Sequence, residues 1–416
     1  MQKSENFTLG LSTVVIGVLA GISSGLLSWF LDSVERFALN WQESLHNAVA
    51  NEVMPSRRLL AVTIGAIIVA VFWYFLRRRQ PLVGVEGALA GKQMPVSGTI
   101  MHVLLQIFFV ATGGSVGREV APREAGALIA QQWQQLTQRV GLAALTQSDR
   151  QLLIASAAGA GFAGIYISPM TGTLFAIEVL LKQINLKITM VSLSMASIAA
   201  FVGGSMKGFN AYYHVGNTAF HSQFVLIILL VAPLSGLVGA WFKKSSGWAT
   251  THQTTGVAIL WQLPIMGLIT GLITMFGMPQ IMGNGRALAQ TALDSLSVKV
   301  LPFLLLAALL KYIVTILTIR AGAAGGVLTP AIGIGSSLGA MIGILLSVVV
   351  PGISIWQSAL FGAVTLLAAS QQAPLMAMFM LFEITHLNAT ALLPLTIGVG
   401  ISTLVSRAVL KQPIVK

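Results

Sequence analysis

The stretch GGSVGREVAP, residues 113–122, lies between two long apolar segments and carries a charged pair, Arg118 and Glu119. Charged side chains inside a bilayer are costly, so an ionisable pair at this place indicates a functional site. The three glycines allow a tight turn, and Pro122 is compatible with the first turn of a following helix. A glycine-rich break that opens into a helix directs backbone N–H groups and the positive end of the helix dipole at whatever lies in front. The stretch therefore predicts an anion-binding site, for which the carboxylate of Glu119 competes.

The composition is that of a membrane protein. Hydrophobic residues make up 55% of the 416 residues and charged residues 9%, and the mean hydropathy is +0.84, whereas about 25% of the residues in an ordinary soluble domain are charged. We therefore predict an all-α, polytopic membrane protein, and we treat residues 1–416 as one transmembrane domain. Several of its apolar segments are too short to span a bilayer or are interrupted by Gly and Pro. These segments lie near residues 8–30, 59–76, 103–112, 152–181, 190–205, 224–242, 257–278, 301–319, 331–350, 358–382 and 391–410.

The net charge of +12 arises from 24 Lys+Arg against 12 Asp+Glu. The basic residues gather between apolar segments, at 77–79, at Lys182 and Lys187, and at 243–244, as the positive-inside rule describes for cytoplasmic loops. The charge therefore reflects membrane topology, and we expect no nucleic-acid partner. A positive potential also draws anions toward the protein.

The sequence offers no catalytic or metal-binding pattern. It has no cysteine, and its six His residues show no metal-ligand spacing, so we expect no disulfide, metal or cofactor. The apolar segments contain no HExxH motif, no serine–histidine arrangement and no paired aspartates, so we expect no enzyme. The amino terminus lacks the features of a cleaved signal peptide. The chain ends just past its last apolar segment, and we expect no regulatory domain there.

The second half of the chain repeats the plan of the first. A second glycine-rich break, GAAGGVLTP at 322–330, also ends in Pro. Pro169 precedes Glu178 by nine residues and Pro374 precedes Glu383 by nine, with one offset for both pairs: 383 − 178 = 374 − 169 = 205. We therefore predict a duplication, with repeats at 8–205 and 224–410. Interrupted helices at matching places in two repeats indicate a binding site near the middle of the membrane.

These motifs resemble those of the CLC family of chloride channels and proton/chloride antiporters. Residues 115–119, SVGRE, resemble the family's glycine-arginine-glutamate motif, and 325–330, GGVLTP, resemble its GxFxP motif with Leu328 in place of Phe. Residues 278–285, MPQIMGNG, resemble the segment that opens the family's second half. The prolines and glutamates of the duplication also match, and the likeness covers nearly the whole chain in order.

The resemblance implies a homodimer with one pore in each subunit, built from inverted repeats with discontinuous and re-entrant helices. It implies a channel, of the voltage-gated kind, or a transporter for chloride or a similar monovalent anion, in the inner membrane of a bacterium. Glu119 is then the gating residue, and the backbone N–H groups of Val327 and Leu328 hold the central anion. A proton and the anion compete for the position of the Glu119 carboxylate. The anion-binding residues expected in this way are Gly117, Arg118, Val120, Gly326, Val327, Leu328 and Gln80.

The chain also departs from the family pattern. The family's GSGIP motif, whose serine contacts the anion, is absent near 79–83, and an alignment anchored on 86–89 puts Gln80 at the place of that serine. The family's inner tyrosine corresponds to Val415. Residues 120–122, VAP, replace the usual Gly-Pro after the gating glutamate. Because fluoride-exporting members also lack the serine motif, these differences leave chloride and fluoride open.

Proton coupling is also left open by the sequence. The antiporters carry a second, inward-facing glutamate where this chain has Val179, as channels do, but some relatives couple protons without it. We interpret Glu178 as structural. Glu124, five residues after Glu119, faces solvent, an arginine or the vestibule. A cation-coupled solute carrier is an alternative of a different class, but it should carry acidic groups at both breaks, and only Glu119 stands at one.

Overall fold

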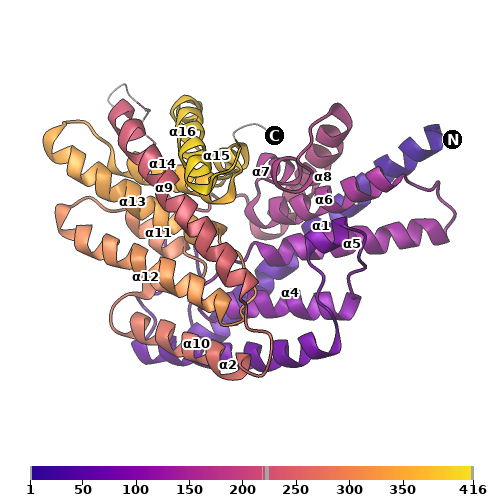
Figure 1. Ribbon diagram of the computed structural model, residues 1–416, viewed down its shortest axis with the longest axis horizontal. Helices are drawn as coiled ribbons and strands as arrows, with labels where there is room; N and C mark the ends of the chain where they lie inside the picture. The colour runs from indigo at the N-terminus through magenta and orange to yellow at the C-terminus, as the bar shows by residue number, and fades with distance from the viewer. Residues whose placement is uncertain (1, 218, 221–223, 414–416) are drawn as a thin grey trace. The chain divides into compact units, whose positions relative to one another are not determined.

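The chain is helical in the computed structural model, which describes residues 2–217, 219–220 and 224–413 (Figure 1). Seven helices in this part of the chain are long and apolar enough to cross a membrane. They are α1 (Gln2–Leu39), α2 (Pro55–Arg79), α8 (Leu186–Lys207), α9 (Phe224–Thr251), α12 (Leu301–Arg320), α13 (Leu328–Val349) and α16 (Leu392–Leu410).

Shorter helices fill the intervals between these spans. The apolar ones are α4 (Val96–Ala111), α7 (Pro169–Leu174) with a π-helical continuation (Phe175–Leu181), α10 (Ile259–Met275) and α15 (Pro374–Ile384). The others are α3 (Val85–Leu89), α5 (Val120–Arg139), α6 (Gln147–Tyr166), α11 (Arg286–Leu293) and α14 (Ile355–Gln371). The prediction of an all-α, polytopic fold is confirmed.

Two apolar segments of the sequence are each broken into two helices by the same local geometry. The segment 152–181 divides at Ile167 (φ 54°), and 358–382 divides at Gln372 (φ 58°). In each case a proline then occupies the first position of the next helix, α7 or α15. The residues before these prolines have closely similar conformations, φ −132° and ψ 79° at Ser168 and φ −134° and ψ 75° at Ala373. The repeat boundaries 8–205 and 224–410 stay a prediction.

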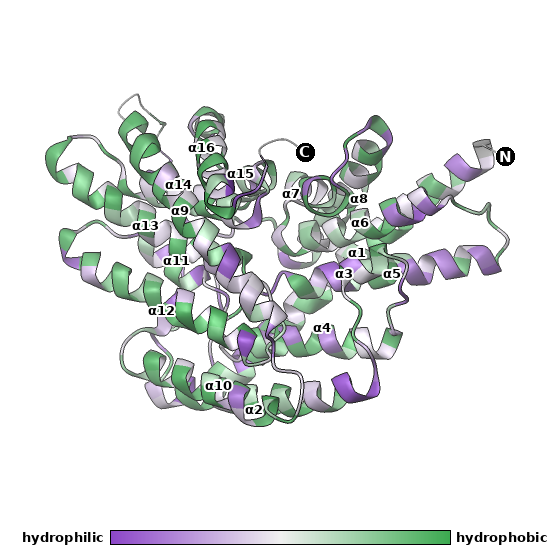
Figure 2. Cartoon of the chain, in the orientation of Figure 1, coloured by the Kyte–Doolittle hydropathy of each residue, from purple (hydrophilic) through white to green (hydrophobic). Residues whose placement is uncertain are grey.

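The extents of two helices do not match the apolar segments of the sequence. Helix α9 continues to Thr251, so Lys243 and Lys244 lie within it and not in a loop after it. Helix α5 follows Glu119 but matches no apolar segment, because its last three turns are rich in Gln, as the hydrophilic colouring of its far end shows (Figure 2).

The chain forms two compact units. Unit 1 consists of 1–30, 75–107 and 119–210. In it, α6 packs against α5, α7 and α8. The small residues of α6 allow this close packing: any side chain larger than hydrogen at Gly161 would meet the carbonyl oxygen of Pro122, in the first turn of α5. The start of α5 is thereby held against α6.

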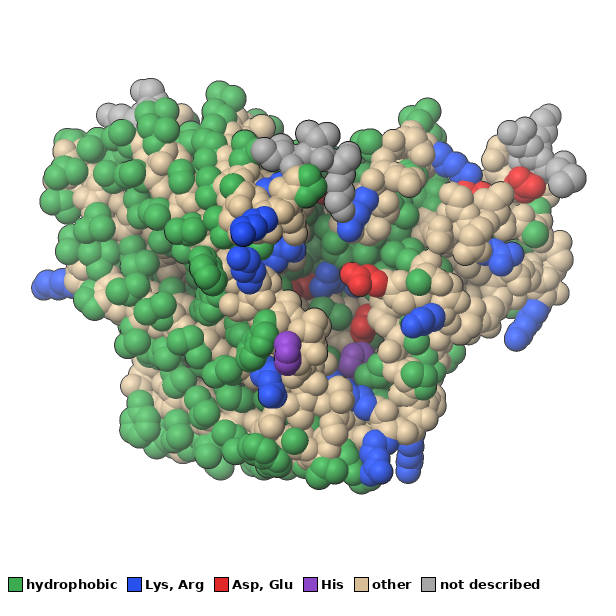
Figure 3. Space-filling view, viewed as in Figure 1, with side chains coloured by type: hydrophobic (Ala, Val, Ile, Leu, Met, Phe, Trp, Pro, Cys, Tyr) green, Lys and Arg blue, Asp and Glu red, His purple; other side chains and the backbone are tan. Residues whose placement is uncertain are grey.

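Unit 2 consists of 31–74, 108–118 and 211–416. Helices α9, α12, α13 and α14 lie side by side in it (Figure 1), and hydrophobic side chains cover most of the visible surface of α12 and α13 (Figure 3). Gly335 and Gly339 of α13 approach the backbone of Gly362 and Ser358 of α14. Backbone contact of this kind is typical of helices packed in lipid.

Candidate anion-binding site

The two glycine-rich breaks of the sequence meet within unit 2. Gly117 donates its N–H to the carbonyl of Gly326 (2.7 Å), and Gly326 donates to the carbonyl of Gly117 (2.8 Å). Four residues before each of these glycines lies another with a positive φ, Gly113 (φ 106°) and Gly322 (φ 115°). Only glycine adopts such values without strain. The same turn therefore leads the chain into both breaks.

A helix begins directly after each half of this pair. Helix α13 starts at Leu328 with Val327 as its N-cap, and Leu328 is buried while Val327 is partly buried. Helix α5 starts at Val120 with Glu119 as its N-cap. The first turn of a helix directs N–H groups without intrahelical acceptors toward the preceding loop. Each break thus has the local geometry of an anion-binding helix terminus.

Lys311 stabilises the first break, and the sequence did not predict this role. Its ammonium group, fully buried in α12, donates to the hydroxyl of Ser115 (2.9 Å) and to the carbonyls of Ile281 (3.1 Å) and Gly283 (2.7 Å). Ser115 in turn donates to the carbonyl of Ile281 (2.9 Å). The signal available in the sequence was a single lysine within an apolar span, since a charge there requires partners.

Glu119 is completely buried at the start of α5. Its backbone carbonyl accepts a hydrogen bond from Nε of Arg123 (2.7 Å). The Arg123 guanidinium lies over two aromatic rings, with its Cζ 4.8 Å from the centroid of Phe175 and 5.8 Å from that of Phe162. Cation–π contacts of this kind are stabilising. Arg123 therefore anchors the backbone of Glu119 to unit 1.

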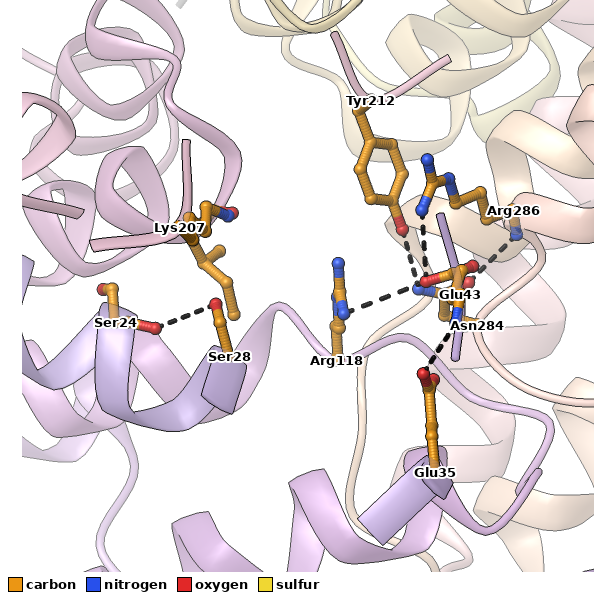
Figure 4. Close-up of polar contacts among 10 residues, drawn as sticks. Ser24, Ser28, Glu35, Glu43, Arg118, Lys207, Tyr212, Asn284 and Arg286 are labelled. Atoms are coloured by element: carbon orange, nitrogen blue, oxygen red, sulfur yellow. Dashed lines mark hydrogen bonds and ion pairs between the residues drawn. The ribbon is translucent and has the colours of Figure 1, made fainter. Parts of the chain in front are cut away.

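Arg118 belongs to a buried charge cluster in unit 2 (Figure 4). One carboxylate oxygen of Glu43 lies 4.0 Å from Nη1 of Arg118 and 3.5 Å from Nη1 of Arg286. Both guanidiniums lie over the ring of Tyr212, at 5.5 and 4.1 Å from its centroid. The acidic loop after α1 thus supplies the counter-charge for the arginine of the GRE motif.

Asn284 and Glu35 complete the cluster (Figure 4). The side-chain amide of Asn284 donates to the hydroxyl of Tyr212 (3.0 Å), and its oxygen accepts from the backbone N–H of Arg286 (3.0 Å). Glu35 accepts from the backbone N–H of Glu43 (3.0 Å). A cavity of about 30 Å³ lies beside both glutamates, which is space enough for a water molecule. The resemblance to a family had not indicated Glu43 or Arg286.

The cluster leads to a stability prediction. Removing the carboxylate that lies between two buried guanidiniums should destabilise the fold, and for Glu43→Gln we expect a loss of about 3 kcal/mol. Arg286→Gln should cost less, because Glu43 keeps Arg118 as its partner. Thermal unfolding in detergent measures both changes. In the double variant the two losses should be less than additive, and strict additivity would contradict the pairing.

The remaining predicted residues lie in unit 1. Gln80 directly follows α2, is partly buried, and directs its side-chain nitrogen toward the hydroxyl of Ser97 (3.4 Å). Glu178 and Val179 lie in the π-helical segment after α7, and such segments are frequent at functional sites. Val415 lies outside the described residues. The roles of Gln80 and of the other expected anion-binding residues stay predictions.

Glu124 is buried, so its solvent-facing interpretation is wrong. It is 7% exposed and accepts a hydrogen bond from Gln106 (2.8 Å). Among the described residues, no group of three His, Asp or Glu side chains could hold a metal ion.

Comparison with known proteins identifies the family. Residues 64–407 match the family described as voltage gated chloride channel. A Salmonella typhi protein named "Voltage-gated ClC-type chloride channel ClcB" is 29% identical over 393 residues, which cover 90% of each chain. An Escherichia coli protein of the same name is 29% identical over 430 residues, which cover 97% of each.

Solved structures share the fold. A slow cyanobacterial Cl⁻/H⁺ antiporter is 23% identical with a TM-score of 0.78, and a CLC-type fluoride/proton antiporter is 23% identical with a TM-score of 0.74. Each alignment covers 97% of this chain and 96% of the solved chain. The fold and the family match make this a membrane transport protein and not an enzyme, and the chain belongs to the CLC family of voltage-gated chloride channels.

Proposed function

We propose that this CLC-family protein moves chloride or a similar monovalent anion across the membrane past the paired breaks at Gly117 and Gly326, and that Glu119 is its gate. The observation that carries the proposal is the reciprocal pair of hydrogen bonds between those glycines. Along the chain, α5 begins three residues after Gly117 and α13 two residues after Gly326. Two helix termini that start from one paired segment supply the N–H groups and partial positive charge that an anion needs.

Backbone donors suit a transport site better than a fixed cation would. An anion bound by amide dipoles is held firmly enough for selection and loosely enough for release. We assign this role to Gly117, Val120, Gly326, Val327 and Leu328. Arg118 is neutralised by Glu43 and contributes to the potential around the path. Gln80 supplies an amide donor at the place of the family serine.

The burial of Glu119 supports its role as the gate. In this proposal its carboxylate occupies a position that an anion can take. Protonation or an incoming anion therefore displaces it. As in the family at large, we propose a homodimer with one anion path in each subunit.

The proposal is tested by anion release from proteoliposomes. Vesicles with the full chain, loaded with chloride or with fluoride, should release the preferred anion once an ionophore dissipates the membrane potential. A protein that releases neither anion faster than empty vesicles would contradict the proposed function. The ratio of the two rates decides whether the protein favours fluoride over chloride.

A further inference from the structure

A polar cluster inside unit 1 has no part in the anion path described above. Glu124 lies on α5, and Gln106 and His102 lie on α4, one helical turn apart and therefore on one face. Their residues are 7%, 0% and 8% exposed. A buried ionisable group in a membrane protein indicates a functional site. Neighbouring glutamate and histidine side chains are typical of proton relays.

The side chains of Gln106 and His102 approach the same carboxylate oxygen of Glu124. Nε2 of Gln106 donates to Oε2 of Glu124 at 2.8 Å, and Nε2 of His102 lies 3.7 Å from the same oxygen. The other amide atom of Gln106, Oε1, is buried and has no hydrogen-bond partner among the described residues. The cluster therefore holds an acceptor that the present arrangement leaves unused.

Gln106 is suited to both protonation states of Glu124. Its amide nitrogen donates to the ionised carboxylate, as it does here. After rotation of the amide by half a turn, Oε1 would accept a hydrogen bond from the protonated carboxyl group. A lysine or arginine at this place would stabilise only the ionised form. Glutamine thus keeps one hydrogen bond to Glu124 in both protonation states.

Charged groups on several helices surround the cluster. Arg123, beside Glu124 on α5, is the cation that acts electrostatically on the carboxylate. Arg77 on α2 interacts electrostatically with His102. Tyr166 on α6 and Glu119 interact electrostatically with Arg123. Among the described residues, the cation that acts on Glu124 is Arg123, and Arg123 also acts on Glu119. The carboxylate is therefore not locked into a structural ion pair.

We propose that Glu124, Gln106 and His102 form a proton-binding site that passes protons between Glu119 and the side of the membrane marked by the arginines at the end of α2. This inference rests on the proposed function and adds proton coupling to it. Glu124 follows Glu119 by five residues, a rise of about 7.5 Å along α5. A side chain added at Gly84, five residues after Arg79, would lie 3.6 Å from Oε1 of Glu124. The site thus adjoins the loop that follows the triple arginine.

The test compares anion and proton movement in the same proteoliposomes. With an imposed chloride gradient, the wild type should drive protons against their gradient. Glu124→Gln should retain anion release within about threefold of the wild type and lose proton movement by about tenfold or more, since it carries no titratable proton. Glu124→Asp should recover a measurable part of the proton movement. Asp149→Asn is the matched control. Asp149, in the first turn of α6, is equally buried, at 6% exposure, and it is paired with Lys187 of α8.

Three results would overturn the inference. They are a wild type that releases anions but moves no protons, a Glu124→Gln variant with unchanged proton movement, and a parallel loss of both fluxes in Glu124→Gln while Asp149→Asn behaves as the wild type. None of these results contradicts anion transport by the wild type. Absence of anion release from the wild type would instead overturn the proposed function.

Discussion

Proteoliposomes with Glu119→Ala should release anion at least as fast as the wild type and should move no protons. The alanine variant lacks the only side chain that, in the proposed gate, competes with the anion. It also lacks the group that would pass a proton to the outer solution. The measurement is simultaneous recording of anion release with an electrode and of external pH.

A matched control separates the gate from a general change of charge. Glu52→Gln, which removes an exposed carboxylate in the loop after α1, should release anion at the wild-type rate. Slower release by Glu119→Ala than by the wild type would contradict the gate.

Lys311→Met should cause the largest loss of stability. Methionine fills a similar volume but removes the donor to the Ser115 hydroxyl and to the carbonyls of Ile281 and Gly283. The Ile281 carbonyl keeps its hydrogen bond from Ser115. The three lost hydrogen bonds come from a charged group and contribute about 1.5–3 kcal/mol each, so a total of about 3 kcal/mol or more is expected. Thermal unfolding in detergent should show a lower midpoint, and anion release should fall because the first break is no longer held in place.

Tyr312→Phe is the matched control for Lys311→Met. Tyr312 is the next residue of α12, and its hydroxyl shares one hydrogen bond with Ser245 (2.7 Å). Its loss should cost only about 1 kcal/mol. If Lys311→Met were no more destabilising than this control, the three contacts of the ammonium group would not support the break.

The sequence could predict the breaks because their requirements are local. Positive φ values at Gly113 and Gly322 and prolines at the first position of α7 and α15 are needs of single residues. Such needs are met by residue type. For the same reason the position of Glu119, at the start of a helix after a glycine-rich turn, was predicted correctly.

The sequence alone determined a polytopic helical membrane protein, two glycine-rich breaks at matching places and one glutamate at a break. Only the tertiary structure decided which buried charges are neighbours. Lys311 and Ser115 are 196 residues apart along the chain, and Glu43 reaches Arg118 and Arg286 from a loop whose acidity had no evident partner. The environment of Glu124 likewise depends on the packing of α4 against it. A buried charge in a membrane must be compensated, but the compensating group can come from any segment that packing brings within reach, and short-range sequence does not encode which one.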